Sequence, residues 1–175
     1  IGCGRVVSIT QGDYAGVDGA GPEYETMGLL GANTLLGDLE AVAKAHELCN
    51  RYGLDVISTG AVIGFALEAA ERGMISQEDA EGLDLSWGNG NSIVKLVEKI
   101  GRRDGLGRLL GEGVMRAAAQ LGKGSETFAL HVKGLEPAAH DPRAYNSLAV
   151  AYATANRGAC HLQGICLLYT SDAAD

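Results

Sequence analysis

Two carboxylates flank a tyrosine in the stretch GPEYET, residues 21–26. Glu23 and Glu25 follow a glycine-proline turn and precede the apolar run MGLLGAN. One interpretation is a solvated helix start, because acidic side chains in a first turn complement the positive end of the helix dipole. The other is that one of these carboxylates accepts or donates protons in an active site. The residue types alone leave both interpretations open.

A second group of reactive side chains forms the run Asn156-Arg157-Gly158-Ala159-Cys160-His161. This run follows a segment of small residues that is expected to be helical, so it stands at a helix end. Arg157 and His161 are suited there either to contact an anionic group or to hydrogen-bond the last carbonyls of the helix. The spacing does not choose between these roles.

The other histidines are better explained by structure than by chemistry. His46 and Cys49 lie on the apolar side of an expected helix, where such side chains are typically packed. His131 stands in an alternating, strand-like run and is expected to be structural. His140 begins the run His140-Asp141-Pro142-Arg143, which is typical of a turn rich in hydrogen-bonding groups.

The four cysteines, Cys3, Cys49, Cys160 and Cys166, lie far apart in the chain. They form no complete metal-binding pattern such as C-x-x-C. The chain as given carries no secretion signal, so we do not expect disulfides.

These side chains have to be positioned by a mainly α, multihelical fold with a short β-rich segment near the N-terminus. Residues 1–22 are polar, glycine-rich and partly β-branched, which predicts short strands or a hairpin. Apolar periodicity and capping residues predict the rest. The expected elements are a helix from Asp38 to a stop at Gly53, a helix from Ser58 or Thr59 to Gly73, a short helix with a capping box at 76–79, a helix capped by Ser92, a helix over 106–121, a strand over 128–134 and a small-residue helix over 144–158.

The overall composition is that of a soluble globular protein, with 46% hydrophobic and 21% charged residues. A formal net charge of -8 argues against a nucleic-acid partner, because phosphate backbones need clustered cations. No uninterrupted apolar stretch reaches the ~18 residues of a membrane span. We therefore expect a cytoplasmic protein without a membrane or nucleic-acid partner.

Five segments occur in one order along the chain: IGCGR (1–5), GPEYET (21–26), CNRYGLDVISTG (49–60), HVKGLEPAAHDPR (131–143) and YATANRGACH (152–161). Together they resemble the two helical C-terminal domains of the tungsten-containing aldehyde:ferredoxin oxidoreductase family. The resemblance runs from Ile1 to about Gly164. It implies that residues 1–165 are an incomplete copy of domains 2 and 3 of such an enzyme.

The last ten residues, 166–175, do not continue this pattern. They resemble the translation of a sequencing adapter, so we expect a non-native tail. No function is then expected of Cys166.

The resemblance implies cofactors. Family members carry tungsten, or alternatively molybdenum, between two pterin dithiolenes and beside a [4Fe–4S] cluster. Cys3 resembles the third cysteine of the family's cluster motif, and the other cluster cysteines are expected outside this chain. The run 50–55 resembles the pterin-binding motif D-x-x-G-L-D with Asn in the first place. The residues implied for cofactor binding are Asn50, Gly53, Leu54, Asp55 and Arg157.

The resemblance also answers the question of the two carboxylates. It implies a catalytic glutamate in PEYE near the metal and a histidine from RGACH. By register with the pterin motif we favour Glu25 over Glu23, and His161 over His140 and His131. The implied reaction converts an aldehyde to a carboxylic acid, with a glutamate that deprotonates water, a histidine that hydrogen-bonds the carbonyl oxygen and ferredoxin as electron acceptor.

Other functions stay open at this point. Another branch of the family is one alternative, such as a sugar-aldehyde oxidoreductase or a benzoyl-CoA reductase subunit, and a non-catalytic helical binding module is another. Some members share a metal across a dimer through an E-x-x-H pair, but this chain has Lys44-Ala45-His46-Glu47 there. We expect no bridging metal, while the resemblance leaves a homodimer open.

Overall fold

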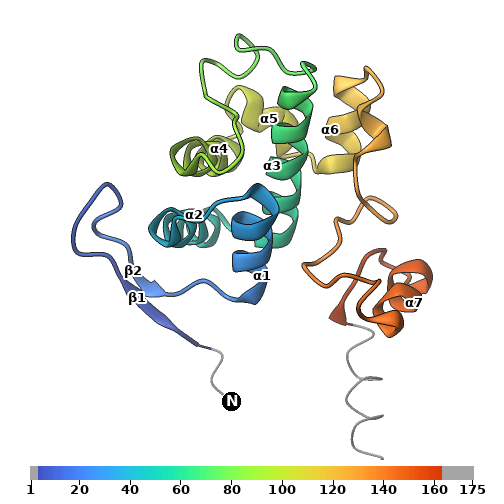
Figure 1. The fold of residues 1–175 in the computed structure, drawn as a ribbon, viewed down its shortest axis with the longest axis horizontal. Coiled ribbons are helices and arrows are strands. Elements are labelled where there is room, and N and C mark those ends of the chain that lie inside the picture. Colours follow the sequence, from blue (N-terminus) through green and yellow to red (C-terminus); the bar gives the residue numbers. More distant parts are fainter. Residues whose placement is uncertain (1–3, 163–175) are drawn as a thin grey trace, which may run out of the picture.

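A computed structural model describes residues 4–162 and is mainly α-helical (Figure 1). In that part of the chain, seven α-helices and three short π- or 3₁₀-helical turns accompany one two-stranded sheet. The fold class expected from the sequence is confirmed. No single helix among these residues is long and apolar enough to cross a membrane; α2 and α3 pass only as a pair, and the chain bends by 120° between them.

The N-terminal segment is a hairpin, as predicted. Strand β1 (Val6–Ser8) pairs antiparallel with β2 (Asp18–Ala20), with Val6 opposite Ala20. Just beyond it, Ile9 and Val17 bury their side chains with Ala43 of the following helical layer. The hairpin is thereby fixed to the helices rather than projecting freely.

An irregular helical segment follows the hairpin. It consists of α1 (Tyr24–Thr26), the π-helical turn η1 (Met27–Gly31) and the 3₁₀ turn η2 (Ala32–Thr34). Isolated π-helical turns are rare, and they occur frequently at functional sites. Glu25 lies two residues before the start of η1.

Helices α2 (Leu39–Tyr52), α3 (Val56–Glu71) and α4 (Gly90–Arg102) form the centre of the molecule. As predicted, the Asp38 side chain accepts hydrogen bonds from the first turn of α2, and Gly53 ends this helix with a φ of 66°. The predicted starts of the other two helices are wrong. Asp55 caps α3 and Asn89 caps α4, each by accepting a backbone N–H three residues later. Ser58, Thr59 and Ser92 therefore lie inside their helices.

The single helix predicted over 106–121 is also wrong, because the structure divides it into α5 (Leu106–Leu110) and α6 (Val114–Leu121). Gly113 separates them with a φ of 83°, which is unfavourable for other residues. The buried Glu136 carboxylate then accepts the Val114 N–H at 2.7 Å. A distant side chain, rather than a local one, starts α6.

Two other predicted elements differ. Ser76 and Asp79 exchange the hydrogen bonds of a capping box, but the residues that follow form turns rather than a helix. The predicted strand over 128–134 is wrong. After η3 (Ser125–Thr127) the chain is irregular, with one isolated bridge between Val132 and Leu135. The small-residue helix is α7 (Asn146–Thr154), shorter at both ends than predicted.

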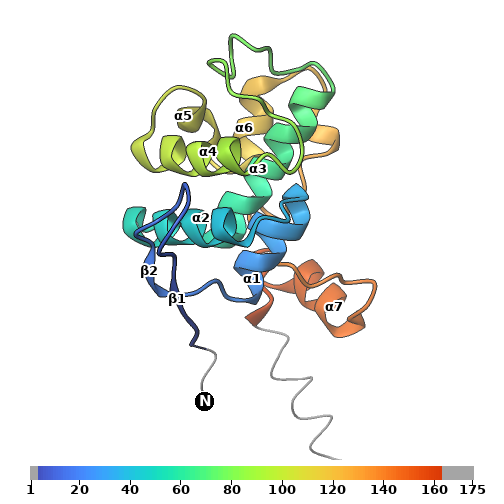
Figure 2. The same ribbon diagram turned by 60° about the vertical axis from the view of Figure 1, so that its left-hand side comes forward.

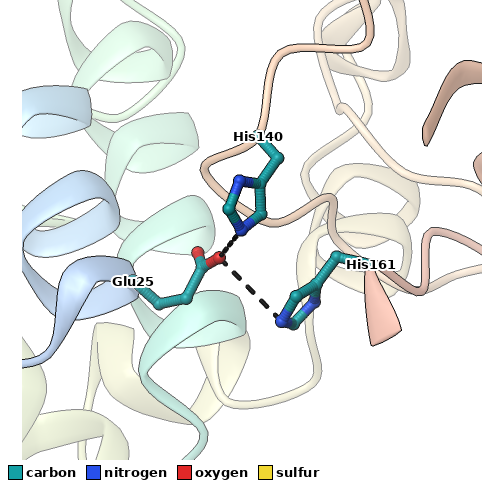
Figure 3. Close-up of side chains that lie close together, drawn as sticks. All are labelled: Glu25, His140 and His161. Carbon is teal, nitrogen blue, oxygen red and sulfur yellow. Dashed lines mark ion pairs between the residues drawn. The ribbon is translucent and has the colours of Figure 1, made fainter. Parts of the chain in front are cut away.

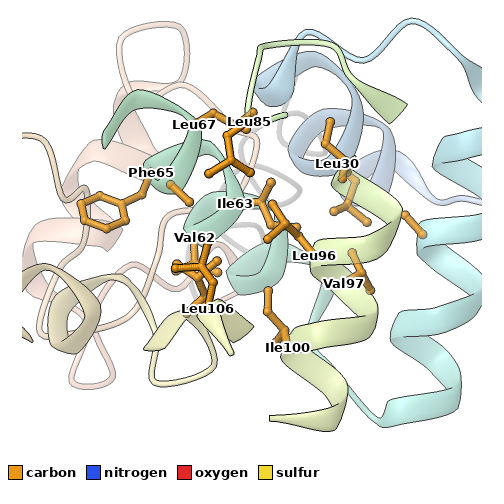
Figure 4. Packing of buried hydrophobic residues seen from close by; sticks show 14 of the residues in the cluster. Leu30, Val62, Ile63, Phe65, Leu67, Leu85, Leu96, Val97, Ile100 and Leu106 are labelled. Atoms are coloured by element: carbon orange, nitrogen blue, oxygen red, sulfur yellow. The ribbon is translucent and has the colours of Figure 1, made fainter. Parts of the chain in front are cut away.

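The main core lies between α2, α3 and α4 and extends to α5 and α6 (Figure 4). Its largest fully buried side chains include Leu30, Ile63, Leu67, Leu96 and Leu110. A separate small cluster holds Leu148, Tyr152 and Ala159. The segment with α7 lies on the α1 side of the molecule, away from α4 and α5, in both views (Figures 1 and 2).

Candidate functional site

Glu25 meets two histidines that come from distant parts of the chain (Figure 3). Its Oε1 atom lies 3.0 Å from His140 Nε2 and 4.0 Å from His161 Nε2. The three side chains are mostly buried, with 15%, 23% and 19% of their surfaces exposed. They belong to α1, to the loop after Pro137 and to the turn that follows α7. The structure therefore brings together Glu25 and His161, the two residues that the sequence favoured, and adds His140.

Contacts with Ala139 hold Glu25 in place. The Ala139 N–H donates to Glu25 Oε2 at 2.8 Å, and the Tyr24 hydroxyl donates to the Ala139 carbonyl at 2.8 Å. Gly28 permits this approach, because a Cβ atom there would lie 2.4 Å from the Ala139 Cβ. Two neighbouring residues of α1 thus hydrogen-bond both backbone groups of Ala139.

Aromatic side chains fix the ring of His140. The Tyr24 ring stacks on it at 5.0 Å with an interplanar angle of 21°, and Tyr145 approaches edge-on at 6.2 Å. The buried Tyr152 donates its hydroxyl to the His140 carbonyl at 3.3 Å. Burial, followed by the negative charge of Glu25, raises the pKa of Tyr152, so this hydroxyl keeps its proton.

A tight turn after α7 returns His161 to the site. Gly158 has a φ of 107°, and a Cβ atom there would lie 2.1 Å from the Val132 carbonyl oxygen. Ala159 and Cys160 are buried next to it. The His161 ring then comes to 5.5 Å from the ring of His140.

Glu25 Oε1 is buried and accepts no hydrogen bond within residues 4–162. His140 Nε2 lies 3.0 Å from this oxygen, but the contact does not form a hydrogen bond. Buried polar atoms in folded proteins nearly always have a partner, so an orphaned carboxylate oxygen between two imidazoles points to a ligand or a reacting group.

The other predicted acid–base candidates lie elsewhere. Glu23 is exposed at the start of α1, and no ion pair or hydrogen bond joins it to His140 or His161 in the described part of the chain. His131 accepts the Gly134 N–H at 3.2 Å within its own loop, as expected of a structural residue. Among the three histidines that were weighed, only His140 and His161 contact the Glu25 carboxylate.

A buried histidine connects this site to the motif at 50–55. His46 Nδ1 lies 3.1 Å from the Thr26 hydroxyl, and His46 Nε2 lies 3.1 Å from the Asn50 side-chain nitrogen. Burial lowers the pKa of His46 despite the negative charge of Glu23, so the ring is neutral near pH 7. His46 is packed, as predicted, and it also links the residue after Glu25 to the first residue of the motif.

The motif itself lies at the junction between α2 and α3. The Leu54 N–H donates to the Cys49 carbonyl at 2.8 Å, which closes the end of α2. Asn50, Gly53 and Asp55 are exposed there, and the space that a Gly53 Cβ would enter is open. An exposed amide, an exposed carboxylate and an open backbone suit a flat ligand rich in N–H groups, so these residues fit a pterin.

The fit to an iron–sulfur cluster is poor within the described residues. Cys49 and Cys160 are both buried, and burial raises the pKa of Cys49 to about 12, which keeps it a protonated thiol. The cluster candidate Cys3 and the predicted tail with Cys166 lie outside the described residues. Arg157 is exposed, with Nη1 4.0 Å from Cys160 Sγ, and does not touch Glu25.

Sequence reasoning ranked His140 below His161, and it missed the parts played by Tyr24, Tyr152 and Thr26. No spacing rule identifies these residues. The Tyr24 hydroxyl and the Ala139 carbonyl are separated by 115 positions in the sequence. Only the fold puts them in contact.

Comparison with known proteins gives consistent results. The chain is 39% identical over 165 residues to the tungsten-containing aldehyde ferredoxin oxidoreductase of Pyrococcus furiosus, and 39% identical over 164 residues to that of Thermococcus kodakarensis. It is 32% identical over 167 residues to an aliphatic sulfonate oxidoreductase, WOR-like subunit, of Pyrococcus furiosus. These matches take in 93%, 93% and 92% of this chain but only 26%, 26% and 27% of the relatives. The chain thus spans about a quarter of their length.

A solved structure and a family model agree with these relatives. The active site complex BamBC of benzoyl coenzyme A reductase, in complex with 1,5 dienoyl-CoA, has a TM-score of 0.71 and 26% identity, over 88% of this chain and 23% of that one. The family model "Aldehyde ferredoxin oxidoreductase, domains 2 & 3" matches residues 1–171. The chain therefore belongs to the aldehyde ferredoxin oxidoreductase family.

Proposed function

We propose that this chain is part of an oxidoreductase that converts aldehydes to carboxylic acids at a tungsten–bis-pterin centre, or at its molybdenum counterpart. The observation that carries the proposal is the convergence of Glu25 with His140 and His161 next to a family motif suited to a pterin. Family membership alone would not identify the acid–base residues. The group of Glu25, His140 and His161 alone would not identify the reaction.

Asn50, Gly53, Leu54 and Asp55 would hold the pterin at the junction between α2 and α3. Arg157 would pair with an anionic group of the cofactor. When bound, the tungsten–pterin group supplies the two-electron oxidation. Cys3 would be one ligand of a [4Fe–4S] cluster on the way to ferredoxin, and because a cubane needs about four thiolates, the remaining ligands would come from beyond residues 4–162.

The acid–base work falls to this chain's own residues. Conversion of an aldehyde to an acid adds the elements of water at the carbonyl carbon and releases two electrons and two protons. Glu25 would take a proton from the attacking water at Oε1, because Oε2 already accepts the Ala139 N–H. His161 would donate a hydrogen bond to the carbonyl oxygen, which stabilises the negative charge that develops there.

The substrate has a suitable space beside the site. A groove of about 810 Å³ runs from His140 along α3 and the loop 128–139. Its lining is mostly apolar and includes Phe65, Trp87, Phe128 and Pro137. An aldehyde with an apolar substituent would place that substituent in the groove and its carbonyl group at the end where His140 lines it.

Another branch of the family is the second candidate. It is supported by the likeness to the benzoyl coenzyme A reductase complex, at 26% identity, and to the aliphatic sulfonate oxidoreductase subunit, at 32%. The sequence identity to the aldehyde ferredoxin oxidoreductase is higher, at 39%, and for this reason aldehyde oxidation is the preferred proposal.

Replacement of Glu25 tests the proposal. In the full-length, tungsten-loaded enzyme, Glu25→Gln should lower kcat by about 100-fold or more, because an amide cannot accept the proton from water. Metal content by mass spectrometry should stay that of the unchanged enzyme. The matched control is Glu23→Gln, which removes an exposed carboxylate two residues away and should leave turnover intact. Near-normal turnover of Glu25→Gln would exclude Glu25 as the base. Absence of both tungsten and molybdenum from the full-length protein as purified would favour a non-catalytic helical module.

A further inference from the structure

We propose that Glu25, His140 and His161 bind a divalent transition-metal ion, separate from the metal of the proposed function. The three side chains offer one carboxylate oxygen and two imidazole nitrogens that all lie within 4.8 Å of one another. This proposal rests on the contacts of these residues and does not depend on the pterin motif or on aldehyde oxidation.

The distances suit a common ion. Zinc binds imidazole nitrogen and carboxylate oxygen at about 2.0 to 2.2 Å in tetrahedral geometry, so two of its ligands lie about 3.4 Å apart. Glu25 Oε1 lies 3.0 Å from His140 Nε2 and 4.0 Å from His161 Nε2. These two distances lie on either side of that separation, so one ion between the three side chains requires the Glu25–His140 pair to open and the Glu25–His161 pair to close, each by about 0.5 Å.

The orphaned oxygen distinguishes a metal site from a simple ion pair. In a hydrogen bond the N–H points at its acceptor. Among the residues that the structure describes, buried Glu25 Oε1 accepts no hydrogen bond, although a ring nitrogen stands 3.0 Å away. The Glu25 oxygen therefore keeps its lone pairs available to an ion that the histidine nitrogens also reach.

The site is also held in advance of binding. Glu25 Oε2 is tied to the Ala139 N–H, the His140 ring is stacked on Tyr24, and His161 follows a turn packed on Val132. The other two histidines do not compete, because His46 contacts Thr26 and Asn50, and His131 accepts the Gly134 N–H.

The ligand set selects the type of ion. Two imidazoles and one carboxylate suit zinc, or iron(II) in the facial arrangement of two histidines and a carboxylate. Magnesium and calcium prefer oxygen ligands throughout and are disfavoured. Three protein ligands leave at least one coordination position open to water.

Titration of the whole chain with zinc tests the proposal. The chain, freed of metal with a chelator and kept reduced, should bind one Zn²⁺ in isothermal titration calorimetry. Glu25→Gln, His140→Gln and His161→Gln should each weaken binding by at least about 10-fold, the lower end of what even an outer-shell partner contributes. His131→Gln is the matched control and should bind as the unchanged chain does.

Cobalt(II) gives a readout that does not depend on stability. Its visible d–d bands should appear on binding without the strong near-ultraviolet absorption of cobalt–thiolate bonds, and they should be lost in His140→Gln and His161→Gln. Absence of binding would overturn the metal site, and so would thiolate absorption or an equal loss in His131→Gln. None of these results would bear on the proposal that Glu25 is the catalytic base, because that proposal is tested by the turnover of the Glu25→Gln enzyme. In the loaded enzyme, zinc should inhibit, because it occupies the Glu25 oxygen that takes the proton.

Discussion

At the scale of single residues, the decisive contacts are made by buried carboxylates that reach across the chain. Glu25 holds the Ala139 N–H, and Glu136 holds both the Val114 N–H and the Ser58 hydroxyl. Glu136 is 4% exposed, so its bonds are shielded from water. Such a group stabilises only while its partners are in place, because an unpaired buried polar atom loses its hydration without compensation.

Glu136→Ala should therefore destabilise the chain by about 1 to 3 kcal/mol, the usual effect of leaving buried partners unsatisfied. The Val114 N–H at the start of α6 and the Ser58 hydroxyl would both lose their acceptor. Urea unfolding followed by circular dichroism measures the change. The control is Glu126→Ala, an exposed carboxylate in η3, which should stay within about 0.5 kcal/mol. Equal midpoints for the two variants would show that the Glu136 bonds contribute nothing net.

At the scale of elements, the start and the end of α2 were predicted correctly from residues next to them in the sequence. Asp38 and Gly53 delimit α2 as predicted, because a side-chain cap and a left-handed glycine act within a few residues. The predicted starts of α3 and α4 were wrong although their caps Asp55 and Asn89 act locally, because the serines three residues further on are also of capping type. The break before α6 could not be predicted locally, because it depends on Glu136. The predicted strand over 128–134 is wrong because, within residues 4–162, the alternating run has no neighbouring strand with which to form a sheet, apart from one bridge between Val132 and Leu135.

Close contact between two elements sets the geometry of the site. Gly28 in η1 faces Ala139, and a Cβ atom there would approach the Ala139 Cβ to 2.4 Å. Within a helix, Ala is intrinsically better than Gly by about 1 kcal/mol. The clash with Ala139 opposes this preference. The atom that a new Cβ would meet is the Ala139 methyl carbon, which is attached directly to the backbone and cannot rotate away.

We expect the clash to win, so that Gly28→Ala destabilises the chain by about 1 to 3 kcal/mol, as overpacking usually does. The change should also push Ala139 and His140 away from Glu25, and the zinc affinity should fall with the stability. Denaturation and calorimetry on the same sample measure both. Gly37→Ala is the control, since a Cβ there meets nothing within 4 Å and φ is not positive. Gain of stability in Gly28→Ala, with zinc binding unchanged, would contradict the packing argument.

At the scale of the whole molecule, the fold class, the hairpin and the family were accessible from the sequence, whereas the assembly of the site was not. Glu25 and His161 were predicted as reactive side chains, whereas His140 was expected in a turn. The contact among the three depends on how the segment 137–162 packs on α1 and η1. That docking uses backbone contacts of Ala139 and a missing side chain at Gly28, neither of which has a pattern in the sequence.

The segment that carries both histidines has much less buried support than the helices around α3. Its own cluster consists of Leu148, Tyr152 and Ala159, while the main core joins α2 to α6. Local opening is easiest where few apolar side chains are buried. Hydrogen exchange of the whole chain should therefore show faster exchange at the amides of α7 than at those of α3.

Zinc binding should slow amide exchange in α7. At a free concentration 100 times Kd, an ion that binds only the docked state stabilises it by about 2.7 kcal/mol, so opening of the segment 137–162 should become about 100-fold rarer. Exchange in α7 and its flanking loops should slow to that extent, while α4, which bears no ligand, should not respond. His161→Gln should abolish the effect. Uniform slowing over the whole chain would mean that zinc acts on global stability alone, and equal protection of α7 and α3 without zinc would show that the docked segment is already as stable as the core.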